Sequence, residues 1–177
     1  MVRAAVYNAA PGVDRRRAHD ALSGAAAELN LPELEAWHAA KAQVGTNPAV
    51  ADRLERVADR AGRRGGFASR ANVLTRAAEL TPEGPTRNAR LIAAAEAALA
   101  AGAAQVGAEL IDRLNEETLD RVQQCRVATV RASFALFTPD PAELVWGTAK
   151  LLDAAAKVHG LDPDLEQTTL ILSLIHI

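Results

Sequence analysis

Apolar residues recur along the chain at intervals of three and four positions, and no stretch shows sustained alternation of apolar and polar residues. This spacing places apolar side chains on one face of a helix. Segment 49–64 is a clear case, with its apolar face formed by Val50, Leu54, Val57, Ala58 and Ala61. The pattern therefore predicts an all-α protein.

Proline and glycine residues mark the ends of the predicted helices. The predicted helices are 1–9, 13–29, 33–44, 49–64, 67–80, 86–101, 103–117, 118–137 and 142–159, followed by one that opens at 162–163. Asn47 and Asp140 are predicted N-caps, because their side chains can accept backbone hydrogen bonds. The predicted buried face of helix 13–29 comprises Ala18, Leu22, Ala25, Ala26 and Leu29.

Helix pairs begin near residues 48, 86 and 118, a spacing typical of stacked helical hairpins. Residues 65–82 resemble the second half of a tetratricopeptide repeat: Gly65 and Gly66 allow a tight turn, small alanines follow, and Pro82 stops the helix. The aromatic signature of that repeat's first helix is missing. We therefore predict antiparallel helical hairpins stacked as a tetratricopeptide-like α-solenoid over residues 48–170.

Composition supports helix and narrows the class of protein. Forty of the 177 residues are alanine, which favours helix and excludes a β-barrel, a disulfide mini-protein or a collagen-like fibre. Residues 1–91 carry fourteen basic and ten acidic side chains, against six and twelve in 92–177, an imbalance too mild for a nucleic-acid surface. The single cysteine, Cys125, and the lack of a long apolar run predict a cytoplasmic protein with no membrane partner.

The last six residues differ in composition from the rest of the chain. Their sequence, Leu-Ser-Leu-Ile-His-Ile at 172–177, matches the translation of a nucleotide string that resembles the transposon-end adapter of sequencing libraries. We therefore expect 172–177 to be an artefactual tail, and the natural sequence to be cut off near Leu170. The alternative interpretation is the start of an apolar helix.

Five segments, in order, carry a family resemblance: VRAAVY at 2–7, RRRAHDAL at 15–22, EAWHAA at 35–40, RRGG at 63–66 and AAELTP at 77–82. Together they resemble the large LuxR-family transcriptional regulators of high-GC actinobacteria, which carry an AAA/STAND-type ATPase. The resemblance covers about residues 2–170. Its structural motif positions here are Tyr7, His19, Trp37, His38, Gly65, Gly66 and Pro82.

The resemblance implies that residues 1–44 are a helical remnant following the ATPase module, and that 48–170 are its tetratricopeptide-like repeats. The chain holds no G-x-x-x-x-G-K-S/T loop and no recognisable DNA-reading helix pair. ATP and Mg²⁺ would belong to a missing upstream domain, and DNA binding to a missing C-terminal domain. The implied function is a regulatory scaffold that binds a protein partner or a small effector on the groove of the repeats, with no cofactor of its own.

Two alternatives stay open: a stand-alone tetratricopeptide-like adaptor that binds proteins, and an enzyme built as a metal-dependent helical bundle. Glu35-x-x-His38 is half of a di-iron motif whose second half is missing. His19-Asp20 lacks the companions of a phosphohydrolase dyad, and Cys125 lacks a basic partner. We expect no catalytic, cofactor-binding or metal-binding residue.

The remaining distinctive residues are expected to be structural. Trp37 and His38 are predicted to anchor the junction with the repeats, as a packed aromatic ring beside a polar tip. Cys125 is predicted to be a small core residue. The basic clusters at 15–17 and 60–64 have acidic neighbours and are predicted to be solvated, salt-bridged helix faces.

Overall fold

The computed structural model describes residues 7–135 and 141–175, and these residues form helices and turns without a strand. The helices are α2 (Gly12–Glu28), α3 (Pro32–Ala42), α4 (Pro48–Arg63), α5 (Phe67–Glu79), α6 (Pro85–Ala100), α7 (Ala104–Ile111), the 3₁₀-helix η1 (Glu116–Thr118), α8 (Arg121–Ala135), α9 (Pro141–Val158) and α10 (Pro163–Ile175). Residues 7–9 are also helical, and the rest of the predicted helix 1–9 lies outside the described residues. The all-α prediction is confirmed.

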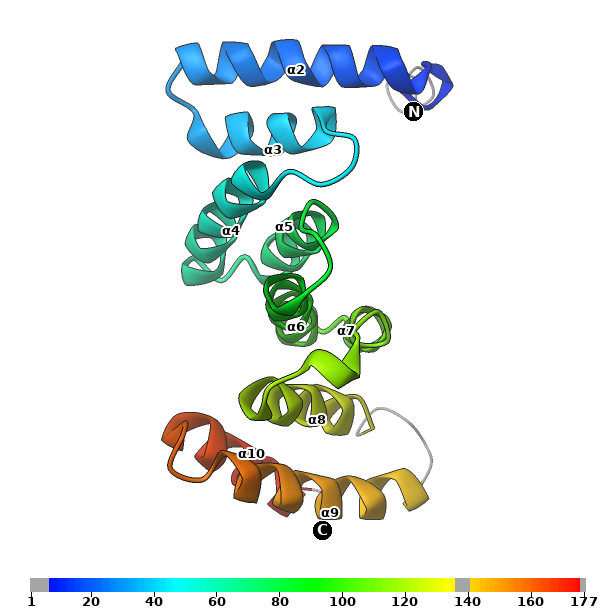
Figure 1. Cartoon of the computed structure of the whole chain (residues 1–177), viewed down its shortest axis with the longest axis vertical. Coiled ribbons are helices and arrows are strands. Elements are labelled where there is room, and N and C mark those ends of the chain that lie inside the picture. Colours follow the sequence, from blue (N-terminus) through cyan, green and yellow to red (C-terminus); the bar gives the residue numbers. More distant parts are fainter. Residues whose placement is uncertain (1–6, 136–140, 176–177) are drawn as a thin grey trace.

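The helices follow one another along the long axis of the molecule, with α2 at one extremity and the pair of α9 and α10 at the other (Figure 1). Each helix packs chiefly against its neighbours in the chain, as α2 does on α3, α5 on α6 and α9 on α10. Helix α6 also contacts α8, across the shorter α7. Such an arrangement is that of stacked hairpins, and its assignment to the tetratricopeptide class stays a prediction.

The region between α7 and α8 differs from the prediction. The expected helix 103–117 ends at Ile111, and α8 begins only at Arg121, so both predicted boundaries are wrong here. A capping box explains the late start: the Gln123 amide donates to Asp120 Oδ1 at 2.8 Å, while the Asp120 amide donates to Gln123 Oε1 at 3.3 Å. These reciprocal bonds stabilise a helix start at 121 rather than at Thr118.

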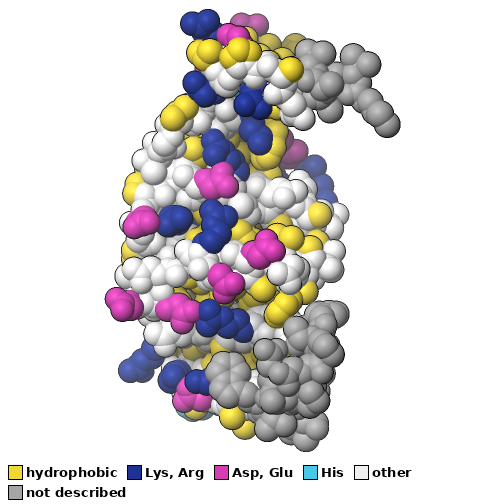
Figure 2. All heavy atoms as spheres, turned by 90° about the vertical axis from the view of Figure 1, so that its right-hand side faces the viewer, with side chains coloured by type: hydrophobic (Ala, Val, Ile, Leu, Met, Phe, Trp, Pro, Cys, Tyr) yellow, Lys and Arg dark blue, Asp and Glu magenta, His cyan; other side chains and the backbone are white. Residues whose placement is uncertain are grey.

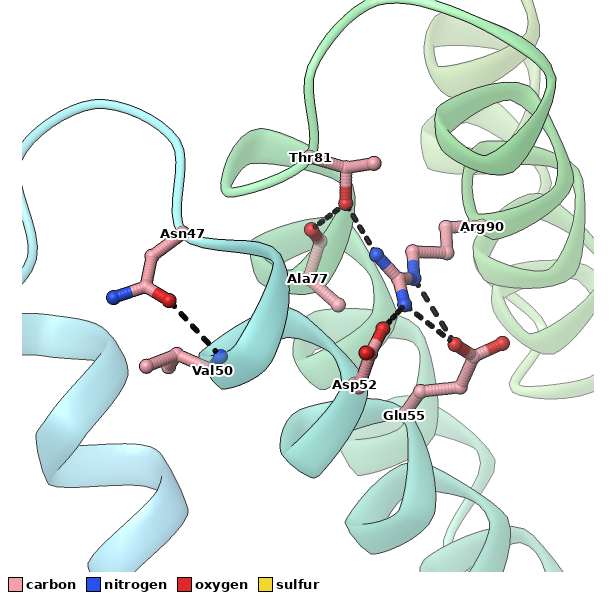
Figure 3. Close-up of polar contacts among 7 residues, drawn as sticks. All are labelled: Asn47, Val50, Asp52, Glu55, Ala77, Thr81 and Arg90. Carbon is pink, nitrogen blue, oxygen red and sulfur yellow. Dashed lines mark hydrogen bonds and ion pairs between the residues drawn. The ribbon is translucent and has the colours of Figure 1, made fainter.

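Other helix ends agree with the prediction. Asn47 Oδ1 accepts a hydrogen bond from the Val50 amide at 3.2 Å, which confirms the N-cap of α4 (Figure 3). Gly65 has a φ of +76°, and a Cβ on Gly66 would lie only 3.1 Å from the carbonyl oxygen of Ala61. The tight turn therefore needs both glycines. Helix α5 ends at Glu79, just before Pro82. The predicted cap Asp140 lies outside the described residues.

The main core runs from α3 to α8 and is built of leucine, valine, isoleucine and alanine. Its largest fully buried side chains include Leu54, Leu74, Leu91, Ile92 and Ile111. Alanines fill the places where helices cross, because a single methyl group lets two backbones approach closely. The buried alanines include Ala58, Ala71, Ala78, Ala94 and Ala98.

Helix α2 turns a different face to its neighbour than its apolar spacing predicts. Of the predicted buried set only Ala26 is buried, while Ala18, Leu22, Ala25 and Leu29 are exposed. Polar contacts decide the orientation, since Ser23 Oγ donates to the Glu35 carbonyl at 3.1 Å and His19 meets His38. The prediction was wrong because it counted apolar spacing alone.

Residues 172–175 continue α10 beyond the point where the tail was expected to begin. Ser173 is buried there, and its hydroxyl donates to the Leu170 carbonyl at 2.7 Å. A helical position does not bear on whether these residues are natural. The artefactual origin of 172–177 stays a prediction.

Candidate functional site

A half-open groove of about 550 Å³ lies where α8 faces α9, with α7 and η1 along one edge. We call it the α8–α9 groove. Its volume is within the range of pockets that hold small ligands or peptide side chains. The α8–α9 groove is the candidate binding site.

Small side chains make up much of the apolar lining of the α8–α9 groove, beside Leu119, Val127 and Phe134. The small members are Ala108, Ala128, Ala132, Ala135, Gly147 and Ala154. None of these carries more than one methyl group, so the facing helices leave space that larger side chains would fill. The floor is therefore apolar and suited to an apolar group of a ligand.

Charged residues of both signs form the rim of the groove. Arg131 on α8 donates to Glu116 Oε1 at 2.6 Å, and Lys157 Nζ lies 2.7 Å from Asp153 Oδ2. Both pairs are largely exposed, so each contributes at most about 1 kcal/mol to stability. Such pairs can exchange partners with a charged ligand at small cost.

Cys125 lines the inner wall of the groove and is buried, which confirms its prediction as a small core residue. Its Sγ lies 3.4 Å from Thr169 Oγ1 on α10. Burial raises the pKa of the Cys125 thiol, so the thiol stays protonated and weakly nucleophilic near neutral pH. The groove therefore presents this sulfur as a packing atom.

A buried arginine joins the helices on the other side of α7 (Figure 3). Arg90 of α6 is 2% exposed. It binds two carboxylates of α4: its Nε lies 3.0 Å from Glu55 Oε2, and its Nη2 donates to Asp52 Oδ1. Its Nη1 donates to Thr81 Oγ1, whose own hydroxyl donates to the Ala77 carbonyl at 2.7 Å. We call this set the Arg90 clamp. It connects α4, the end of α5 and α6.

Sequence reasoning missed the Arg90 clamp, because its partners lie 35 and 38 residues away along the chain. A signal was present: Arg90 stands four, seven and eight residues before Ala94, Ala97 and Ala98, on an apolar face of its helix. A charged residue in that position requires a buried partner.

The first family-motif positions meet at the α2–α3 end of the molecule. Tyr7 Oη lies 2.9 Å from His19 Nε2, and His19 Nδ1 lies 2.9 Å from His38 Nδ1. The two imidazole rings stack with their centroids 5.1 Å apart. Trp37 packs against the main core instead, with Lys41 Nζ 4.9 Å from its ring centre. The motif residues from three segments therefore share one cluster, whereas Gly65, Gly66 and Pro82 serve the turns at either end of α5.

Proton positions in this cluster follow from the hydrogen bonds. Tyr7 can donate to Nε2 of His19, and His19 can then donate from Nδ1 to Nδ1 of His38. In the hydrogen bond between the two rings, one Nδ1 must accept. The ring that accepts carries no proton on that nitrogen and is therefore neutral. Burial, followed by the nearby His38 and Lys41, lowers the pKa of His19.

We expect the free energy of unfolding to fall as the pH drops through and below 6.5, owing to His19. The folded chain keeps His19 neutral while the unfolded chain protonates it, so the contribution is present above the unfolded pKa and is lost in acid. Urea unfolding at pH 7.5 and pH 5.5 measures this slope, which His19→Gln should reduce. Exposed His159 has the opposite effect on the slope. Glu166 raises the pKa of His159, so its contribution to the free energy of unfolding is present in acid and is lost as the pH rises. An equal slope in wild type and variant would contradict the expectation.

No group of three or more His, Cys, Asp and Glu side chains in residues 7–135 and 141–175 is placed to hold a metal ion. Glu35, half of the candidate di-iron motif, accepts a hydrogen bond from Arg53, while His38 contacts His19. Within the same ranges, no helix is both long enough and apolar enough to cross a bilayer. Basic and acidic side chains are interspersed on the face in Figure 2, without a patch of one sign.

No family model, curated protein or solved structure matches the chain. The resemblance to LuxR-family regulators therefore rests on the five sequence segments. Tyr7, His19 and His38, from three of those five segments, contact one another in the structure.

Proposed function

We propose that this chain is a regulatory interaction scaffold of a LuxR-family regulator, and that a protein segment or a small effector binds in the α8–α9 groove. The observation that supports the proposal is the groove itself, with its small apolar floor and its charged rim. ATP, Mg²⁺ and DNA would be bound by other domains of the same protein.

The chemistry of the groove suits binding more than catalysis. The Cys125 thiol is protonated, and the cations Arg131 and Lys157 are paired with carboxylates on the rim. An apolar group can fill the floor while a polar or charged group replaces one rim pair. This division between an apolar floor and a few polar contacts is typical of recognition sites.

Binding in the groove can affect the rest of the array through α8. Arg126 on α8 holds Glu96 on α6 with two hydrogen bonds, the one from Nε at 2.6 Å. Bidentate pairs of this kind fix the relative orientation of two helices. A ligand that binds better to one α8–α9 separation than to another would shift the array between states, as regulation requires.

A groove-filling variant tests the binding site. Anilinonaphthalene sulfonate, an apolar anion, serves as a fluorescent probe for the apolar floor and cationic rim. Ala128→Phe on α8 should weaken its binding by about tenfold or more, a loss of at least 1.4 kcal/mol. Ala108→Phe fills the groove from the α7 side and should act likewise.

The matched control is Ala156→Phe, an exposed position on α9 outside the groove. It should leave probe binding unchanged, and circular dichroism checks that all variants keep their helices. If Ala128→Phe, Ala108→Phe and Ala156→Phe bind the probe equally well, the groove is not the binding site.

The sequence on both sides of the gene tests the regulatory assignment separately. A P-loop ATPase upstream and a helix-turn-helix downstream in the same reading frame would support it. A reading frame that starts and stops near the present ends would favour the stand-alone adaptor instead. Absence of both domains would overturn the LuxR assignment while leaving the groove to be judged by probe binding.

A further inference from the structure

The α8–α9 groove is elongated along the two helices that form most of it. Its lining runs from Gln124 to Ala135 on α8 and from Gly147 to Lys157 on α9. At a rise of 1.5 Å per residue, these stretches are about 16 and 15 Å long. The groove therefore has the length of about three turns of a helix laid along α8.

The lining offers few partners to the backbone of a bound segment. Helices α8 and α9 satisfy their own backbone groups except at their ends. Gln124 is the only amide or hydroxyl side chain among the lining residues that the structure describes. An extended segment would therefore place peptide groups over alanines without hydrogen-bond partners, which is unfavourable. A helix satisfies its own backbone groups, so only its side chains need to fit the groove.

The small residues of the groove recur with helical spacing. Ala128, Ala132 and Ala135 stand four and three residues apart on α8, and Gly147 and Ala154 stand seven residues apart on α9. The side chains on one row of a partner helix follow the same intervals. A row of leucines on such a helix can therefore lie in the space that these small residues leave.

The two sides of the groove carry charges of opposite sign. Figure 1 shows α8 between α7 and α9, which both contact it. On the side of α7 and η1 the lining includes Asp112 and Glu116, and on the side of α9 it includes Lys150 and Lys157. This arrangement is complementary to a helix with basic residues on one flank and acidic residues on the other.

Each side also holds one residue of the other sign. Arg131 lies 2.6 Å from Glu116 Oε1, and Asp153 lies 2.7 Å from Lys157 Nζ. Both pairs are largely exposed and can rearrange at small cost when a partner brings its own charges. The acidic side keeps an excess of carboxylates, and the α9 side keeps an excess of lysines.

We propose that the occupant of the α8–α9 groove is an amphipathic helix of a protein partner, with an apolar row between one basic and one acidic flank. This inference rests on the proposed function of the groove and names its class of partner. The basic flank lies toward Asp112 and Glu116 and the acidic flank toward Lys150 and Lys157. Reversing the helix would exchange the flanks, so these charges fix its direction. A contact of three turns is small, and we expect micromolar affinity.

Labelled helical peptides of about 14 residues, followed by fluorescence anisotropy, test the charge pattern on the whole chain. All carry the same row of leucines. The mixed peptide has lysines on one flank and glutamates on the other, and two comparison peptides have lysines on both flanks or glutamates on both. The mixed peptide should bind about tenfold more tightly than either, because each comparison peptide places like charges against one side of the groove. Equal binding of all three would overturn the proposal.

Charge reversal on α9 should change which peptide is preferred. Lys150→Glu with Lys157→Glu makes both sides of the groove acidic, so the peptide with lysines on both flanks should bind most tightly. The control is Arg56→Glu with Arg63→Glu, at exposed positions on α4 outside the groove, which changes the net charge equally. It should keep the preference for the mixed peptide. If both double variants change preference alike, net charge decides binding and the proposal is wrong.

A proline in the mixed peptide tests whether the bound segment is a helix. Placed at a central position away from the leucine row, it disrupts the helix and leaves the leucines unchanged. Binding should weaken about tenfold or more, and undiminished binding would show that the bound segment is not a helix. Anilinonaphthalene sulfonate separates the two ways of failing. If Ala128→Phe weakens its binding but no peptide binds, the helical partner is wrong and the groove stands. If Ala128→Phe has no effect either, the proposed function fails as well.

Discussion

Replacement of Arg90 by alanine is expected to lower the free energy of unfolding by about 3 kcal/mol. The substitution removes the charge-assisted bonds that join α6 to Asp52 and Glu55 on α4 and to Thr81 after α5. It also leaves a hole where the 2% exposed side chain was packed. Urea unfolding followed by circular dichroism measures the loss.

The partners of Arg90 are expected to matter less when changed one at a time. Asp52 and Glu55 are 57% and 45% exposed, so water can solvate the carboxylate that remains. Asp52→Asn alone should cost about 1 kcal/mol or less, since Glu55 still neutralises the guanidinium. Changing both to amides leaves Arg90 buried without a carboxylate and should cost more than the two single changes together.

Arg87→Ala on the same helix is the control. Its partner Glu83 is 93% exposed at a distance of 3.3 Å, and such a pair contributes less than about 0.5 kcal/mol. Equal losses for Arg90→Ala and Arg87→Ala would mean that the Arg90 clamp does not hold the three helices together.

Ala94→Leu is expected to lower the free energy of unfolding by about 2–3 kcal/mol. Ala94 on α6 is 0% exposed in the main core, so the three added carbon atoms have no space without moving a neighbouring helix. Leucine is nearly as good a helix former as alanine, so helix propensity does not account for a loss of this size. Thermal and urea unfolding both measure it.

Ala100→Leu is the matched control for this overpacking. Ala100 is the last residue of the same helix and is exposed, so the same three carbon atoms enter solvent. We expect a change within about 0.5 kcal/mol. If Ala94→Leu were as well tolerated as Ala100→Leu, the buried alanines would not be setting the distance between helices.

The sequence could predict most helices, because their ends depend on nearby residues. Asn47 caps α4, Gly65 and Gly66 make the turn before α5, and Pro82 follows its end, all within a few residues of the backbone that they affect. The start of α8 was missed for a local reason too, since the reciprocal bonds of Asp120 and Gln123 were not considered.

Features that depend on distant residues were not predictable in the same way. The face that α2 turns to α3 follows from contacts of His19 with His38, nineteen residues on, and not from apolar spacing. The Arg90 clamp joins residues more than thirty positions apart. The sequence predicted a groove on the repeats but not its place between α8 and α9. That place depends on the distance between these two helices, which no local pattern specifies.

The packing of each helix against its chain neighbours has a consequence for how the molecule forms. Contacts such as those of α4 with α5 and α5 with α6 join residues that are close in sequence, so little entropy is lost in closing the loops between them. Low contact order of this kind is associated with folding in microseconds to milliseconds. A hairpin such as α4–α5 can therefore form before its neighbours, because its contacts lie within one short stretch of the chain.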